Sequence, residues 1–86
     1  MYEIIISKSA ERELKKLSLD VYQSVKQIIY SLADNPRPFG VETMTKYGKG
    51  RHYRVRIGDY RIIYKIHDEV VTVEIVKVGH RREIYK

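Results

Sequence analysis

The sequence contains no cysteine among its 86 residues. The chain therefore has no disulfide bond, no thiol nucleophile and no thiolate ligand for zinc, which fits the reducing environment of the cytosol. No stretch approaches the roughly 20 apolar residues of a membrane-spanning helix. The apolar run after Met1 is too short for a signal peptide and is interrupted by charge at once. These absences predict a soluble, cytoplasmic protein.

The usual signatures of catalysis are missing as well. The chain has no Gly-x-Ser-x-Gly motif, no phosphate-binding glycine-rich loop and no His-Glu-x-x-His zinc helix. His52, His67 and His80 lie far apart in the sequence, and no carboxylate cluster has the spacing of a metal site. We therefore predict no metal and no other cofactor, and we expect His52 and His67 to lie at strand ends on the surface.

Positive charge is what the sequence has in excess. Lysine and arginine number 17 against 11 aspartates and glutamates, which gives a formal net charge of +6 and a pI of about 9.6. A short chain with this excess of positive charge is attracted to polyanions. The alternative explanation of the same charge is a surface that only keeps the protein soluble. Apolar residues make up 43% of the chain. This fraction is enough for one core, and the length predicts a single domain over residues 1–86.

Hydrophobic periodicity predicts a strand and two helices in the first part of the chain. The β-branched, apolar residues 2–7 indicate a strand. A helix follows, capped by Ser7 or Ser9. A second amphipathic helix begins after Ser18 and ends before Pro36, because the residue before a proline is pushed away from helical angles.

The second part of the chain predicts a sheet. Residues 35–51 hold both prolines and three of the five glycines and are expected to be a loop. From residue 52 the period becomes two, with two-residue turns at Gly58-Asp59 and Asp68-Glu69, and Gly79 stops the last strand. The predicted fold is α+β: an N-terminal strand, an antiparallel helical hairpin, then a three-stranded antiparallel meander with a short C-terminal tail. The three strands are expected at residues 52–58, 60–67 and 70–78.

The turns fix the register, and the register sorts side chains onto two faces. The predicted pairs are Ile57–Tyr60, Arg56–Arg61, Val55–Ile62 and Arg54–Ile63 in the first hairpin, and Arg61–Val76, Ile63–Glu74 and Lys65–Thr72 in the second. The face expected to pack on the helices holds Tyr53, Val55, Ile57, Tyr60, Ile62, Tyr64, Ile66, Val71, Val73 and Ile75. The other face holds Arg54, Arg56, Arg61, Lys65 and Glu74 around Ile63 and Val76.

The arginines on this second face indicate a phosphate site. Arg56 and Arg61 directly opposite each other repel, and a sheet selected only for solubility would more often mix signs there. Arginine binds phosphate through two parallel hydrogen bonds. The alternative interpretation is a solvated outer face.

RNA is the phosphate polymer whose cleavage fits such a face. Its 2′-hydroxyl can attack the adjacent phosphorus, so the protein has only to orient the attack, stabilise the charge and protonate the leaving oxygen. Arg81 and Tyr85 would join Arg61 if Gly79 folds the tail back. DNA could be bound by the same face but has no 2′-hydroxyl.

Two segments resemble the RelE branch of the RelE/ParE toxin superfamily: Tyr60-Arg61-Ile62-Ile63-Tyr64-Lys65-Ile66, and the run from Val76 to Tyr85. The order of elements is similar along nearly the whole chain. The resemblance implies a toxin of a type II toxin–antitoxin system, a metal-independent endoribonuclease that enters the ribosomal A site, cuts mRNA and inhibits translation. It also implies a RelB-like antitoxin in a hetero-oligomeric complex, and the basic surface predicts that this partner is acidic.

The resemblance assigns roles to individual residues. Arg61 resembles the arginine that stabilises the transition state, Arg81 the arginine assigned to the leaving group, and Tyr85 the terminal tyrosine that orients the substrate. Further RNA contacts are expected from Arg54, Arg56, Lys65 and Arg82.

One departure leaves the general base open. Arg54 and Arg56 stand where RelE has two lysines, and arginine stays protonated in proteins, so it cannot accept a proton. His80 is one candidate because histidine titrates near neutral pH, and Glu74 is a second. Each also has a plainer interpretation: His80 as a phosphate contact or an exposed residue, and Glu74 as an ion-pair partner of Arg61 or Lys65.

Two other functions stay open at the level of sequence. A ParE-like protein shares the fold but poisons DNA gyrase by binding, and the presence of Arg61, Arg81 and Tyr85 argues against it. A catalytically silent RNA-binding member would also fit, since arginines in place of lysines could reflect lost chemistry.

Overall fold

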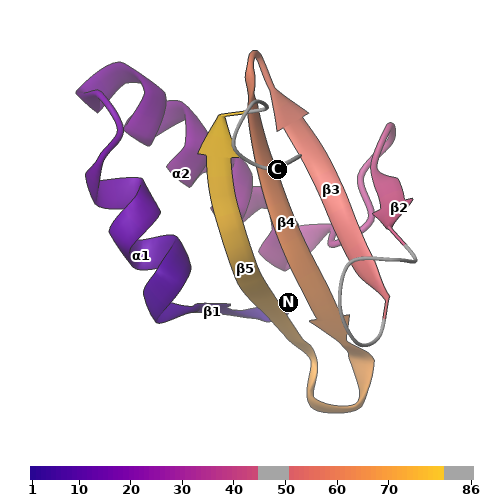
Figure 1. Cartoon of the computed structure of the whole chain (residues 1–86). Helices are drawn as coiled ribbons and strands as arrows, with labels where there is room; N and C mark the ends of the chain where they lie inside the picture. Colours follow the sequence, from indigo (N-terminus) through magenta and orange to yellow (C-terminus); the bar gives the residue numbers. More distant parts are fainter. Residues whose placement is uncertain (45–50, 81–86) are drawn as a thin grey trace.

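The computed structural model describes residues 1–44 and 51–80, which form a five-stranded sheet and two α-helices (Figure 1). The strand order is β1-β5-β4-β3-β2. β1 runs parallel to β5, and the other neighbouring strands are antiparallel. The elements are β1 (Glu3–Ile6), α1 (Lys8–Lys15), α2 (Leu19–Asp34), β2 (Glu42–Met44), β3 (His52–Ile57), β4 (Tyr60–His67), the 3-10 helix η1 (Asp68–Val70) and β5 (Thr72–His80).

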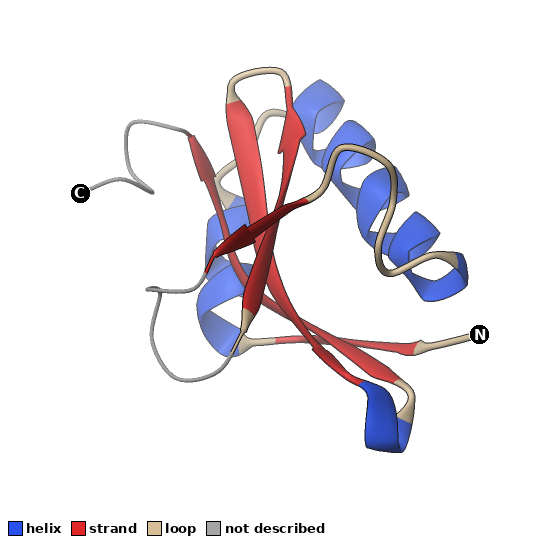
Figure 2. Cartoon of the chain, turned by 90° about the vertical axis from the view of Figure 1, so that its right-hand side faces the viewer, coloured by secondary structure: helices blue, strands red, loops and turns tan. Residues whose placement is uncertain are grey.

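The predicted α+β class and the two helices are confirmed. The Ser7 hydroxyl accepts a hydrogen bond from the Ala10 amide at 3.1 Å and so caps α1. Ser18 takes extended backbone angles at the start of α2 but makes no side-chain cap bond. Asn35, which precedes a proline, turns to an extended conformation and ends the helix. In Figure 2 the long helix α2 lies along one side of the strands.

The β3–β4 hairpin has the predicted register. Ile57 pairs with Tyr60 and Arg56 with Arg61, as a two-residue turn requires. Gly58 has φ of +56°, a left-handed angle that glycine adopts at little cost. This turn therefore fixes the alignment of the two strands that carry the arginines.

The β4–β5 register differs from the prediction. η1 and the left-handed Val71 make the connection longer than Asp68-Glu69 alone, and the register shifts again between Ile63 and Tyr64. This second shift is a bulge, in which one strand contributes an extra residue. The observed pairs are Arg61–Gly79, Ile63–Lys77 and Lys65–Glu74, so the predicted partners Val76, Glu74 and Thr72 are wrong.

The segment predicted as a loop contains a strand. β2 pairs with the start of β3, Glu42 lying opposite Arg54 and Met44 opposite His52. Three residues are too short to show a period of two, which is why the pattern gave no strand there. β2 is the outermost strand next to β3.

The core lies between the sheet and the two helices, and it contains Ala10, Leu14, Val25, Ile29, Leu32, Tyr53, Ile62, Tyr64, Val73, Ile75 and Val78. Most of the predicted sheet residues are there or packed against it. Val71, predicted in this face, is 46% exposed because it lies in the turn, and Val78 enters the core after the bulge. Each large apolar side chain buried here contributes roughly 1.5–3 kcal/mol before the entropy of ordering is subtracted.

Side chains of α1 and of its N-cap residue cover the edge of β5 where β1 ends. The Ser7 hydroxyl donates to the carbonyl of Val76 at 3.1 Å. The Glu13 carboxylate accepts from the Val78 amide at 3.0 Å and pairs with Lys77 at 3.1 Å. These contacts satisfy backbone groups that an uncovered edge strand would leave unpaired. None of the helices within residues 1–44 and 51–80 is long and apolar enough to cross a membrane.

Candidate nucleic-acid interface

Three arginines share the face of the sheet that points away from the helices. Arg56 is directly across from Arg61, and Arg54 precedes Arg56 by two residues on the same strand, so alternation places all three on one side. We call Arg54, Arg56 and Arg61 the arginine face. Ile63, opposite Arg54, lies in the middle of this side and is fully buried. The predicted clustering of the three arginines on one face is confirmed, and Ile63 within this face is not exposed to solvent.

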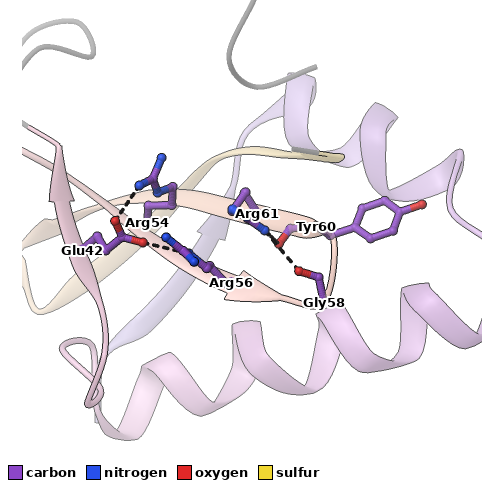
Figure 3. Close-up of polar contacts among 6 residues, drawn as sticks. All are labelled: Glu42, Arg54, Arg56, Gly58, Tyr60 and Arg61. Atoms are coloured by element: carbon purple, nitrogen blue, oxygen red, sulfur yellow. Dashed lines mark hydrogen bonds and ion pairs between the residues drawn. The ribbon is translucent and has the colours of Figure 1, made fainter. Parts of the chain in front are cut away.

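Glu42 from β2 pairs with two of the three arginines (Figure 3). One carboxylate oxygen accepts from Nη2 of Arg54 at 2.6 Å, and the other accepts from Nε of Arg56 at 2.9 Å. The Arg54 guanidinium, and after it that of Arg56, hold the pKa of the Glu42 carboxyl below its ordinary value. The carboxylate is therefore ionised at neutral pH and bridges the two cations.

Arg61 has a different environment. Its side chain points along the hairpin, where Nη1 donates to the carbonyl oxygens of Gly58 at 3.2 Å and Tyr60 at 3.1 Å (Figure 3). The residue is only 7% exposed. Its Nε is buried without a hydrogen-bond partner among the residues that the structure describes. A buried, incompletely paired guanidinium is costly, and such groups in native proteins call for an explanation.

Lys65 and Glu74 lie farther along the sheet. Lys65 is four residues beyond Arg61 on β4 and pairs in register with Glu74, which places it about 13 Å from Arg61 along the strand. The Glu74 carboxylate contacts Nε2 of His67 at 2.9 Å. Glu74 was expected to form an ion pair with Arg61 or Lys65. Arg61 lies opposite Gly79, so the pair with Arg61 is wrong; Lys65 is the neighbour of Glu74 in register, and the Glu74 carboxylate contacts His67.

His80 and His52 also differ from the arginines in position. His80 pairs with Tyr60 at the end of β5, and the two rings meet edge to face with centroids 5.4 Å apart. Tyr60 and Arg61 are consecutive on β4, so their side chains leave the sheet on opposite faces and His80 goes with Tyr60. His52, expected on the surface, is buried at 4% exposure; the strand β2 beside it was missed in the sequence.

Arg81, Arg82 and Tyr85 lie outside the described residues. Within residues 1–44 and 51–80, no three histidine, aspartate or glutamate side chains cluster in a way that could hold a metal ion. Glu42 is the residue that sequence reasoning missed at this site. The signal that could have found it is the single carboxylate in the short segment Val41-Glu42-Thr43-Met44, which precedes the arginine-bearing strand.

The sequence and the fold match a known class of toxins. The family described as the ParE toxin of type II toxin–antitoxin systems, parDE, matches residues 4–85. The chain belongs to this family.

Within the superfamily the chain is a RelE-like toxin. It is 31% identical to Toxin RelG of Mycobacterium tuberculosis, over 99% of this chain and 97% of that protein. It is 27% identical to the mRNA interferase toxin RelE of Escherichia coli, over 98% of this chain and 90% of that protein. The crystal structure of the archaeal RelE–RelB complex from Pyrococcus horikoshii OT3 contains a chain that is similar with a TM-score of 0.80 and 29% identity, covering 93% of this chain and 94% of that one.

Proposed function

We propose that this toxin is an endoribonuclease that cleaves mRNA on the ribosome and so inhibits translation. The observation that carries the proposal is Arg61, whose guanidinium is held at the hairpin turn with Nε buried and unpaired among the described residues. A phosphate oxygen is a partner that would complete its hydrogen bonding. The name of the E. coli relative, an mRNA interferase, supports the same activity.

The reaction needs no group beyond the RNA and the protein. The 2′-oxygen forms a bond to the adjacent phosphorus while the bond to the 5′-oxygen breaks, leaving a cyclic phosphate and a 5′-hydroxyl. A base takes the 2′ proton and an acid supplies one to the leaving oxygen. Arg61 stabilises the negative charge that builds on the phosphoryl oxygens, and Arg54 and Arg56 hold the flanking backbone.

We assign to two tail residues the roles that the RelE resemblance implies: Arg81 assists the leaving group and Tyr85 orients the substrate. Arg82, and Lys65 on β4, are proposed to bind neighbouring phosphates. His80 leaves the sheet on the side away from Arg61, so a proton transfer by His80 requires the RNA to pass around the end of β5. Glu74 is too distant from Arg61 for that task, at about five residues of strand from Gly79.

A cognate antitoxin is the proposed partner. The similar structures from Pyrococcus horikoshii and Mycobacterium tuberculosis are of toxin–antitoxin complexes. A chain of net charge +6 is attracted to an acidic segment. We place that segment over the arginine face, where it would neutralise the toxin by competing with RNA phosphate.

Regulated expression in cells tests the proposed activity. Wild-type toxin, produced without its antitoxin, stops protein synthesis and leaves breaks within codons that primer extension on a reporter mRNA detects. The double variant Arg61→Ala/Arg81→Ala removes both effects while circular dichroism shows an unchanged fold. Arg12→Ala, which removes an exposed positive charge from α1, is the matched control and keeps full activity. Full toxicity of the double variant would reject the proposal.

A second function has one observation in its favour, because the matching family is described by its ParE members. A ParE-like poison acts on DNA gyrase by binding. It would trigger DNA damage before protein synthesis falls, and reporter mRNA would stay intact. The order of these two responses after induction separates the alternatives.

A further inference from the structure

Glu42 lies where one carboxylate can control two of the proposed RNA-binding arginines. It is opposite Arg54 on the neighbouring strand, and its two oxygens contact Nη2 of Arg54 and Nε of Arg56. We infer that Glu42 is a positioning residue, which holds Arg54 and Arg56 as one unit on the arginine face. This inference rests on the proposed function of that face.

Electrostatics explains why such a residue is needed. Arg54 and Arg56 are two residues apart on one strand, so their side chains start about 7 Å from each other on the same face. Like charges this close repel, and both side chains have many rotamers. A carboxylate between them replaces the repulsion by two charge-assisted hydrogen bonds and removes much of that freedom.

The contact leaves Arg56 able to bind a ligand. Glu42 accepts from Nε of Arg56, so this contact does not use the two terminal nitrogens of the guanidinium. The Arg56 side chain is 60% exposed, whereas that of Arg54 is 13% exposed. Arg54 therefore acts mainly by fixing the position of Glu42 and, through it, of Arg56. Arg56 supplies the hydrogen-bond donors to the phosphate. The strand β2, which the sequence analysis missed, supplies the Glu42 carboxylate to this unit.

Two other roles for Glu42 make different predictions. A carboxylate that only competed with RNA phosphate would slow cleavage, so its removal would speed the reaction. A general base would have to take up a proton, which would break both ion pairs, and the two guanidinium groups favour the ionised carboxylate. Positioning alone predicts a slower reaction whose pH profile keeps its shape.

Single-turnover cleavage of mRNA on programmed ribosomes tests the inference. Glu42→Gln slows cleavage about tenfold or more, since misplacing a binding group by about an ångström is enough for such losses. The same substitution has no further effect in the Arg54→Ala/Arg56→Ala background. Glu74→Gln is the matched control: it also removes a paired carboxylate from the sheet, the partner being His67, and it leaves the rate unchanged. Faster cleavage by Glu42→Gln, loss of one limb of its pH profile, or an undiminished effect in the double-alanine background would each overturn the inference.

A measurement without RNA keeps this inference separate from the proposed function. In the wild-type toxin, the Nε–H of Arg56 is held by Glu42 and exchanges slowly with solvent in ¹⁵N NMR spectra. Glu42→Gln speeds this exchange, while Glu74→Gln does not. If Arg56 exchanges equally fast in wild type and Glu42→Gln, positioning is wrong whatever the enzyme does. If the NMR result holds and wild-type toxin cleaves no RNA, only the proposed function fails.

Discussion

Arg37 and Arg61 lie in two regions of the molecule and differ in the partners of their guanidinium groups. Arg37 pairs with Asp68 at 2.9 Å and lies over the ring of Tyr53, with its guanidinium carbon 5.6 Å from the ring centre. Asp68 also accepts a hydrogen bond from the Tyr2 hydroxyl at 2.8 Å. These contacts join the N-terminal segment, the chain after α2 and the turn between β4 and β5.

Arg61 does not connect distant segments in this way. In the described part of the chain its side chain donates hydrogen bonds to two carbonyls of its own hairpin, and its Nε is buried without a hydrogen-bond partner. The difference teaches that arginine count alone does not define a functional surface. A cation with a carboxylate and an aromatic partner holds segments together, whereas a buried cation with an unused donor calls for another explanation, for which we propose a functional role.

Substituting each arginine by alanine is the sharpest way to break this comparison, and it has the largest expected effect. Arg61→Ala lowers the cleavage rate at least about 100-fold, the loss typical of removing one donor to developing charge. It changes the free energy of unfolding by less than about 1 kcal/mol, since the loss of two hydrogen bonds from the guanidinium to backbone carbonyls is offset by the removal of an unsatisfied buried group.

Arg37→Ala gives the reverse pattern. The protein loses about 1 kcal/mol of stability through one partly exposed ion pair and one cation–π contact. Cleavage at a temperature where the variant is folded stays within about twofold of wild type. Urea unfolding and single-turnover cleavage, measured on both variants, check the two statements. A stability loss at Arg61 larger than that at Arg37 would remove the distinction.

Tyr64→Phe tests a second contact that stabilises the fold near Arg37, and we expect it to have a smaller effect than that of Arg61→Ala on cleavage. The Tyr64 hydroxyl is buried and donates to the Pro36 carbonyl at 2.7 Å, and burial raises the pKa of this phenol above its ordinary value. Removing the hydroxyl leaves a buried acceptor unpaired, which costs about 1–2 kcal/mol. Urea unfolding measures the loss. Tyr30→Phe, on the exposed side of α2, is the control and should be neutral.

The pH dependence of stability has the smallest expected effect. The hydrogen bond from Arg37, followed by that from Tyr2, lowers the pKa of Asp68 in the folded protein. A lowered folded-state pKa gives stability that is complete above the unfolded value of about 3.9 and is lost as pH falls through the folded value. Asp68→Asn therefore loses less stability than wild type between about pH 4 and pH 2.

Thermal unfolding over that pH range provides the check. Glu69→Gln, next to Asp68 in the same turn but outside the Arg37–Asp68–Tyr2 cluster, is the control and follows the wild-type curve. An Asp68→Asn curve that also follows wild type would show that the cluster adds no acid-sensitive stability.

Local signals explain how much of the fold could be predicted. Ser7 and Gly58 specify a helix start and a two-residue turn by themselves, so α1 and the β3–β4 register were predicted correctly. The β4–β5 register was wrong, because the left-handed Val71 and the bulge arise from packing that no short motif encodes. β2 is held by its pairing with β3, a tertiary contact.

The candidate site, like the fold, was predicted only in part. Alternation placed Arg54, Arg56 and Arg61 on one face, which the structure confirms. The burial of Arg61 and the bridge from Glu42 depend on elements that meet only after folding. The positions of Arg81 and Tyr85 relative to Arg61 remain predictions from the RelE resemblance.

The central claim is that Arg61 contacts the scissile phosphate, and sulfur substitution in the mRNA tests it most directly. A single non-bridging oxygen of that phosphate is replaced by sulfur, each stereoisomer separately, and cleavage on programmed ribosomes is timed for wild type and Arg61→Ala. We predict that one isomer slows the wild type by about tenfold, a loss of about 1.4 kcal/mol, and slows Arg61→Ala far less. Equal slowing of both proteins by both isomers would contradict the claim.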